Sequence, residues 1–224
     1  MLNLFVFGNG ESRKDFDINS LRKNKNNIII GCNAFYRDFR PDILCAVDVP
    51  IQEEIITNCS YLKDIIFIRR HRKSNITKDI EIHVKHTVLK ETLRGVEYKD
   101  VLKIYPDMGY ASGPTSVYIT LLHILPYHAF IDTVYLLGFD LYTLENGKVN
   151  SMYKDTNCYI ESKRKGTKHG TSAKQLATCF NMFRDVNFKR VLDSGNINPP
   201  EFSGISNIKT ISYKELENEL WISR

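Results

Sequence analysis

The sequence predicts an α/β protein with a mainly parallel β-sheet and helices on both of its faces. Short apolar runs rich in β-branched and aromatic residues recur along the chain, and such runs are typical of strands buried on both faces of a parallel sheet. Several of these runs stop at glycine, asparagine or aspartate, the residues that turn a chain at a strand end. The run from Val134 to Leu137, which stops at Gly138, is the clearest example.

Length and composition set the domain organisation. The chain has 224 residues, of which 42% are hydrophobic and 25% charged, as in ordinary soluble globular proteins. This length suits one domain or two small ones, and we expect a single domain over residues 1–224 with a lid inserted at about 143–168. No apolar run reaches the roughly 18 residues that a membrane span needs. The N-terminus resembles a first strand more than a signal peptide.

The cysteines indicate the compartment. Five of them are scattered along the chain, and none forms a Cys-x-x-Cys pair. This pattern argues against a zinc site and favours a reducing compartment, so we expect a cytoplasmic protein.

The apolar runs define the strands in chain order. Each is four to five residues long and is followed by a polar or glycine-containing turn, the usual end of a buried strand. Strands are expected at Leu4–Phe7, Ile28–Gly31, Ile43–Val47, Ile65–Ile68, Val134–Leu137, Lys189–Leu192 and Ile208–Ile211.

Helices are expected between the strands, on the evidence of capping residues and apolar faces. Pro50 stands near the start of one helix, where proline is favoured, and Ser212 with Glu215 has the spacing of a capping box. The expected helices are Asp17–Lys23, Pro50–Asn58, Ser112–Pro126, Thr171–Phe183 and Tyr213–Leu220. The pattern between Arg69 and Asp107 defines no clear element.

Small polar residues follow the expected strands and predict a ligand site. In open α/β sheets, ligands bind just beyond the carboxyl ends of the strands. The turn Gly8-Asn9-Gly10 allows close approach of the backbone to a phosphate or nucleotide, although an ordinary turn has the same pattern. The other candidates can bond a ribose, a base or a phosphate. They are Asn33, Asp48, Gly138 and Asp140.

Two further segments are candidates for anion contacts. Ser112 and Gly113 open the expected helix 112–126, whose first amides could hold an anion or simply be capped. The long polar segment 143–168 has the character of a lid. Its end carries the basic residues Arg164, Lys165 and Lys168. Such a group suits contacts to phosphate or to an acidic acceptor, although a net charge of +5 also fits an ordinary solvated surface.

The order of these motifs resembles that of the bacterial sialyltransferases of glycosyltransferase family 42. It is also similar to a broader group of phage and bacterial proteins with the same Rossmann-like, glycosyltransferase-A-like fold. The resemblance covers roughly residues 2–195. The motifs are Phe7-Gly8-Asn9-Gly10-x-Ser12, Cys32-Asn33-x-Phe35-Tyr36, Ser112-Gly113, Gly138-Phe139-Asp140-Leu141-Tyr142 and His169 before a helix.

The resemblance implies a metal-independent, inverting transferase that uses a CMP-sugar donor and no cofactor. By position, Asn9 and Asn33 would hold the nucleotide and its phosphate, Asp48 would lie near the ribose, and Ser112 and Gly113 would face the donor. Family members are often tetramers, so a homo-oligomer is expected. The family usually has an arginine at the position of Gly109 and an asparagine at that of Asp48, so the donor sugar stays open.

The resemblance also implies three catalytic side chains. Tyr142, and Tyr153 from the lid, would donate hydroxyl hydrogen bonds to the leaving phosphate, and His169 would be the general base on the acceptor hydroxyl. This chemistry is coherent in itself, because histidine titrates near neutral pH and hydroxyls or cations can stabilise the phosphate without a metal. The acceptor is left open between a glycan and hydroxymethylated DNA.

Two other functions are kept as alternatives. A diphosphokinase-like phosphotransferase would need Mg²⁺, which Asp48 and Asp140 could hold. A non-catalytic protein that only binds a nucleotide would need neither a base nor a metal.

Overall fold

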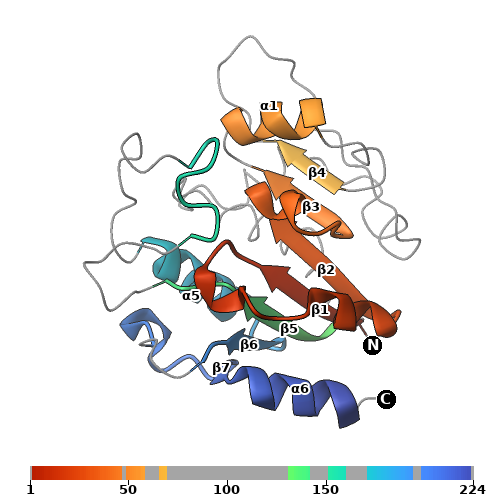
Figure 1. The fold of residues 1–224 in the computed structure, drawn as a ribbon. Coiled ribbons are helices and arrows are strands. Elements are labelled where there is room, and N and C mark those ends of the chain that lie inside the picture. Colours follow the sequence, from red (N-terminus) through yellow and green to blue (C-terminus); the bar gives the residue numbers. More distant parts are fainter. Residues whose placement is uncertain are drawn as a thin grey trace, which may run out of the picture.

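A seven-stranded sheet forms the centre of the computed structural model (Figure 1). The structure describes residues 2–46, 49–58, 66–69, 131–141, 151–159, 171–193 and 198–222. All neighbouring strands are parallel, as the sequence predicts, and their order is β4-β3-β2-β1-β5-β6-β7. The strands are β1 (Leu2–Phe7), β2 (Asn27–Cys32), β3 (Ile43–Ala46), β4 (Ile66–Arg69), β5 (Ile131–Leu137), β6 (Asn187–Val191) and β7 (Ile208–Ile211).

The strand order reverses at β1. From there the chain adds β2, β3 and β4 on one side, and then returns to place β5, β6 and β7 on the other side. Phe7, the last residue of β1, is level with Gly31 of β2 and Leu137 of β5, so the three strands end at one edge. Such a reversal opens a crevice at the carboxyl ends of the strands.

Two apolar cores cover the two faces of the sheet. Alternate residues of a strand point to opposite faces. Accordingly, Leu4 and Val6 of β1 join one core, whereas Phe5 and Phe7 join the other. The first core is closed by the helix α5 (Thr171–Met182) and the 3-10 helix η7 (Pro200–Phe202). The second core is closed by α1 (Val49–Asn58), α6 (Tyr213–Ile222) and the 3-10 helix η2 (Ile18–Lys23).

The described helices follow the sequence expectations closely. In α6 the expected capping box is present, because the Glu215 amide donates to Ser212 Oγ at 3.2 Å and the Ser212 amide donates to Glu215 Oε2 at 2.7 Å. The segment expected as a short helix at 17–23 is a 3-10 helix whose cap, Asp17, accepts a bond from the Asn19 amide. Two further 3-10 helices were not expected from the sequence, η1 (Glu11–Arg13) and η3 (Asn33–Arg37). The expected helix 112–126 lies outside the described residues.

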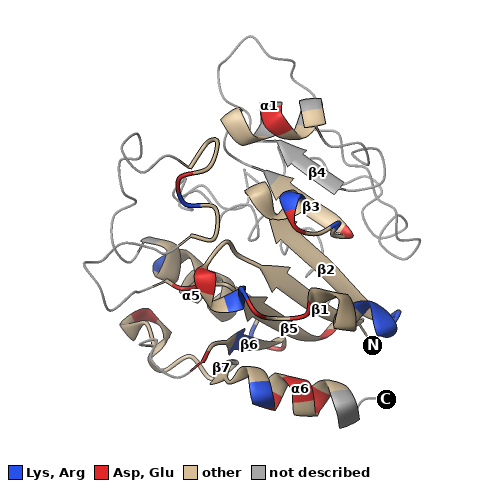
Figure 2. Ribbon diagram, viewed as in Figure 1, with Lys and Arg blue, Asp and Glu red and all other residues tan. Residues whose placement is uncertain are grey.

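The strands β1 and β2 carry no charged side chain. Figure 2 shows these two strands without charge along their length, whereas β6 contains basic residues. This distribution follows from burial, since β2 has no exposed residue and both faces of β1 are covered. Among the described residues, no helix is long and apolar enough to cross a membrane.

Candidate functional site

The turns that follow β1 and β5 are bonded directly to each other. The Gly8 amide donates to the Leu137 carbonyl at 2.8 Å, and the Gly10 amide donates to the Gly138 carbonyl at 2.9 Å. The structure therefore brings together the predicted residues of both strand ends at the point where the strand order reverses. These residues are Gly8, Asn9, Gly10, Gly138 and Asp140.

The two turns approach too closely for any residue but glycine at position 8. A Cβ atom added to Gly8 would lie 2.4 Å from the Gly138 carbonyl oxygen. A Cβ atom on Gly10 would lie 2.5 Å from Asp140 Cγ. Gly138 has a φ of +69°, in the left-handed region that glycine adopts without cost. The glycines thus serve the close packing of two turns, and the Gly-x-Gly pattern is a structural requirement here.

The side chain of Asp140, in the turn after β5, holds the segment that follows the turn after β1. This side chain is buried, and Oδ2 accepts a bond from the Ser12 amide at 2.9 Å. Among the residues that the structure describes, Oδ1 has no hydrogen-bond partner. Arg190 of β6 is fully buried and donates from Nε to the Phe139 carbonyl at 3.0 Å. Burial lowers the pKa of Arg190 to about 10, although the nearby Asp140 carboxylate opposes this shift.

A buried arginine that the sequence did not single out supports the same turn. Arg13 is 2% exposed, and its Nε donates to the Gly8 carbonyl at 2.7 Å. Its Nη2 lies 3.4 Å from Asp38 Oδ2, and its guanidinium lies 4.8 Å from the centre of the Phe35 ring. Asp38, the acidic partner of Arg13, is partly exposed, whereas Arg13 itself is buried. The buried guanidinium therefore contacts the Gly8–Gly10 turn through the Gly8 carbonyl.

Tyr153, the catalytic tyrosine expected in the lid, is buried against this arginine. Its hydroxyl accepts a bond from Arg13 Nη2 at 2.9 Å and donates to Asp38 Oδ2. Burial raises the pKa of Tyr153 above its ordinary value, the Arg13 charge works against this shift, and Asp38 adds to it. Protein groups engage the hydroxyl in this conformation, so its role at a leaving phosphate stays a prediction.

The two predicted asparagines lie at neighbouring strand ends. Asn9 is half-buried, and its Nδ2 donates to the Tyr159 hydroxyl at 3.4 Å while its Oδ1 accepts from the Cys32 thiol at 3.6 Å. Asn33 follows β2 and is buried, with a φ of +47°. A left-handed residue other than glycine is uncommon, and such residues cluster at functional sites. The arrangement of Asn9 and Asn33 fits one crevice shared by β1 and β2.

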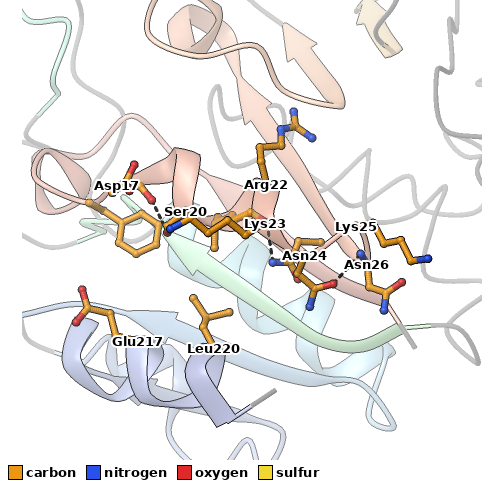
Figure 3. Close-up of a pocket in the computed structure, with 12 residues that line it drawn as sticks. Asp17, Ser20, Arg22, Lys23, Asn24, Lys25, Asn26, Glu217 and Leu220 are labelled. Atoms are coloured by element: carbon orange, nitrogen blue, oxygen red, sulfur yellow. Dashed lines mark hydrogen bonds between the residues drawn. The ribbon is translucent and has the colours of Figure 1, made fainter. Parts of the chain in front are cut away.

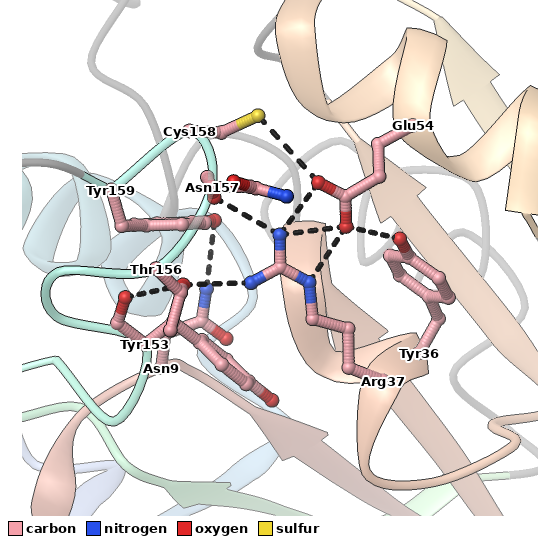
Figure 4. Close-up of polar contacts among 9 residues, drawn as sticks. All are labelled: Asn9, Tyr36, Arg37, Glu54, Tyr153, Thr156, Asn157, Cys158 and Tyr159. Atoms are coloured by element: carbon pink, nitrogen blue, oxygen red, sulfur yellow. Dashed lines mark hydrogen bonds and ion pairs between the residues drawn. The ribbon is translucent and has the colours of Figure 1, made fainter.

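A compact strap, residues 151–159, packs over these strand ends (Figure 4). It is the described part of the predicted lid. The Met152 amide donates to the Asn9 carbonyl at 2.9 Å, which ties the strap to the turn after β1. Arg37 of η3 binds the strap from the other side, with Nη1 on Thr156 Oγ1 at 2.8 Å and Nη2 on the Asn157 carbonyl at 3.0 Å.

Arg37 is itself held by Glu54 of α1. Nε and Nη2 donate to the two oxygens of this carboxylate at 2.7 and 2.6 Å, a bidentate pair. The Tyr36 hydroxyl and the Cys158 thiol also donate to Glu54 (Figure 4). Sequence reasoning missed this cluster, because its members come from elements more than 100 residues apart in the chain.

Several predicted site residues lie outside the described residues. The roles assigned to them in the sequence therefore stay predictions. They are Asp48, Ser112, Gly113, Tyr142, Arg164, Lys165, Lys168 and His169. Within the described part of the chain, no group of three or more histidine, cysteine or acidic side chains is arranged to hold a metal ion.

A hollow lies at the opposite edge of the sheet from the glycine turns (Figure 3). It has a volume of about 900 Å³ and lies between η2 and α6. Lys23 and Lys25 stand on its rim, and Glu217 and Leu220 of α6 form the facing wall. Because Asn24–Asn27 lead into β2, this hollow is remote from the carboxyl ends of the strands and is separate from the candidate site.

The fold and the site define a class of protein: a parallel α/β protein with two glycine turns bonded to each other where the strand order reverses, and with a strap packed on the turn after β1. Comparisons with family models, with curated proteins and with solved structures find nothing that matches the chain. Its function is therefore argued from this site and from the motifs of the sequence.

Proposed function

We propose that the protein is a glycosyltransferase that takes a nucleotide-sugar, with CMP as the nucleotide, into the crevice between β1 and β5. A Rossmann-like, glycosyltransferase-A-like fold is part of this proposal. The observation that carries it is the turn Gly8–Gly10, bonded to Gly138 and underlain by the buried Arg13. In open parallel sheets this is where nucleotide phosphates bind.

The charge at this edge suits a phosphate. Arg13 is buried and its only described carboxylate neighbour within an ion-pair distance, Asp38, is partly exposed. A buried cation projects a positive potential further than a solvated one, because its surroundings screen it less than water does. A ligand phosphate near the Gly8–Gly10 turn would be stabilised by this potential without touching Arg13.

The proposed reaction uses residues at the same edge and in the lid. His169 takes the proton of the acceptor hydroxyl, whose oxygen attacks the anomeric carbon of the donor sugar. The bond between that carbon and the phosphate oxygen breaks, and CMP leaves with the electron pair, so the anomeric configuration inverts. Tyr142 and Tyr153 donate to the departing phosphate, which requires the Tyr153 hydroxyl to leave Asp38. Arg164, Lys165 and Lys168 contact the phosphate or the acceptor.

The first test is binding of CMP, measured as a shift in thermal unfolding with and without Mg²⁺. A ligand at about 100 times its Kd stabilises a protein by about 2.7 kcal/mol. For a chain of this size that is a rise of about 5–10 °C. We expect this rise with CMP alone and no dependence on EDTA. If the unfolding temperature rose only with another nucleotide plus Mg²⁺, a CMP-linked donor would be contradicted and a phosphotransferase favoured.

The second test is turnover of the His169→Ala variant. We expect loss of sugar transfer from CMP-sugars with CMP binding nearly unchanged, because the base acts on the acceptor and not on the nucleotide. His128→Ala, a histidine outside the motif order, serves as the control and should keep its activity. Persistent turnover in His169→Ala would remove this residue from the mechanism.

Salt dependence separates the two kinds of acceptor. Contacts to DNA phosphates release counterions, so transfer to hydroxymethylated DNA should fall steeply as salt rises from about 50 to 200 mM. Transfer to a neutral oligosaccharide should change little over this range. The acceptor class is therefore identified by which acceptor is modified and by how steeply the rate of sugar transfer falls as the salt concentration rises.

A further inference from the structure

Arg37 connects the strap 151–159 to the body of the protein through two separate sets of bonds. One set, from Nε and Nη2, goes to Glu54 of α1. The other, from Nη1 and Nη2, goes to Thr156 and Asn157 of the strap. The guanidinium also lies 5.7 Å and 5.9 Å from the ring centres of Tyr153 and Tyr159. A planar guanidinium fork can pair with both carboxylate oxygens and still bond to the strap, in a fixed geometry that the ammonium group of lysine does not offer.

The two sets of bonds differ in strength. The bonds to Glu54 join opposite charges in bidentate geometry, and hydrogen bonds of this kind are the strong ones. The bonds to the strap end on a neutral hydroxyl and a neutral carbonyl. Arg37 would thus stay on α1 if the strap moved, ready to bind it again.

The strap itself holds a backbone conformation that costs energy. Asp155 and Cys158 have φ values of +61° and +67°, in the left-handed region that residues other than glycine rarely adopt. Each such residue costs of the order of 1 kcal/mol and persists only where surrounding contacts hold it. The bonds from Arg37 end on the two residues between them, Thr156 and Asn157. The closed strap is therefore a strained element held by an external clamp.

We propose that Arg37 is the positioning residue that latches the strap over the carboxyl ends of β1 and β2, and that release of Thr156 and Asn157 exposes the turn after β1 to the nucleotide. The second half rests on the proposed function. The latch alone does not, because it is a property of the protein without ligand. The closed strap covers Asn9 directly, since Met152 and Tyr159 bond to it. A ligand that reaches Asn9 must therefore meet the strap.

Amide hydrogen exchange of the free protein tests the latch. Two variants weaken it. Arg37→Lys removes the fork and keeps the bond inside the strap from Thr156 Oγ1 to the Tyr153 carbonyl. Thr156→Val removes the hydroxyl, and with it that internal bond, while Arg37 and Glu54 stay paired, so the latch requires faster exchange in Arg37→Lys as well. We expect exchange in peptides covering 151–159 to quicken by about tenfold or more, the effect of losing one or two bonds to a charged donor. Exchange in β1 should stay slow, which shows that the fold is intact.

The matched control is Arg22→Lys. Arg22 also pairs with a carboxylate, since its Nη1 donates to both oxygens of Asp42, and its Nη2 donates to the Arg40 carbonyl. In the part of the chain that the structure describes, these bonds do not involve the strap. This variant should leave exchange in 151–159 unchanged. Unchanged exchange in Arg37→Lys would overturn the latch, whatever Thr156→Val shows.

The rate of CMP association tests the second half of the proposal. If the strap gates the crevice, stopped-flow mixing should show CMP associating and dissociating several-fold faster in Thr156→Val than in the wild type. Equal rates with altered strap exchange would mean that the strap does not gate this site, and overturn that half. If neither the wild type nor any variant bound CMP, the proposed function would be contradicted. The hydrogen-exchange experiment would still test the latch, because it uses the protein without ligand.

Discussion

At the scale of single residues, the carboxyl group of Glu54 is the titratable group that holds Arg37, and Arg37 in turn binds the strap. Its carboxylate is 13% exposed and receives hydrogen bonds from Tyr36, Arg37 and Cys158. Burial alone would raise the pKa of Glu54, but the bonds from Tyr36 and Arg37 outweigh burial and hold this pKa below its ordinary value. Burial and the bond to Glu54 raise the pKa of Tyr36 to about 12, so this tyrosine remains a donor at neutral pH.

The lowered pKa predicts how Glu54 contributes to stability. A carboxyl group whose pKa is lower in the folded than in the unfolded chain stabilises the fold above the unfolded pKa, and this contribution is lost as pH falls through the folded value. Glu54→Gln should therefore lower the free energy of unfolding at pH 7 by about 1–3 kcal/mol. The difference from the wild type should shrink as pH falls below about 4.5, the ordinary pKa of the group.

Urea unfolding between pH 7 and pH 3 measures this difference. Glu217→Gln, an exposed glutamate on α6, is the control and should track the wild type at every pH. A Glu54→Gln difference that stays constant down to pH 3 would show that the charge of Glu54 does not contribute.

At the scale of elements, the turn after β1 needs glycine at position 8 because the neighbouring turn leaves no room for a side chain. A Cβ atom on Gly8 would meet the backbone of the neighbouring turn at 2.4 Å, and backbone cannot move aside as a flexible side chain can. Gly8→Ala should therefore cost about 1–3 kcal/mol or more of unfolding free energy, as overpacking does. It should also weaken CMP binding, because the turns of β1 and β5 would separate.

Gly204→Ala is the matched control for this substitution. Gly204 has a φ of +76°, but a Cβ atom there meets nothing within 4 Å. It should cost only the strain of a left-handed alanine, about 1 kcal/mol, and leave CMP binding unchanged. Urea unfolding and titration of both variants separate the two effects. Equal losses of stability, with CMP binding intact in Gly8→Ala, would contradict the role of close packing.

The described helices and strands were largely predictable from the sequence, whereas the contacts of Arg13 and Arg37 that hold the strap were not. Strands such as β2 and β5 are signalled by local composition, because a run of β-branched and aromatic residues without charge suits burial on both faces. The positions of Asn9 and Asn33 just after strands were predictable for the same reason, since the apolar runs stop there, while their contacts with a ligand stay a prediction. Arg13 and Arg37 gave no such signal, since their partners Tyr153 and Thr156 are 140 and 119 residues away.

At the scale of the whole molecule, the two halves of the sheet meet along β1 and β5. The strands β1–β4 lie on one side of this seam and β5–β7 on the other. Phe5 of β1 stacks on Tyr135 of β5, with ring centres 4.7 Å apart and planes 7° apart. The Tyr135 hydroxyl donates to Glu219, which also pairs with Lys189, so the seam is tied to α6 as well. These contacts favour one cooperative unit over two small domains.

A single domain predicts that a weakened seam lowers the stability of both halves together. Phe5→Leu keeps an apolar side chain but removes the stack, which should cost about 1–2 kcal/mol. Exchange labelling during urea unfolding would report the midpoints of β2 and β6 separately. Both should shift to lower urea by the same amount, because a two-state domain unfolds as a whole. If β6 kept its wild-type midpoint while β2 lost stability, the chain would consist of two folding units, and the seam between β1 and β5 would be an interface between them.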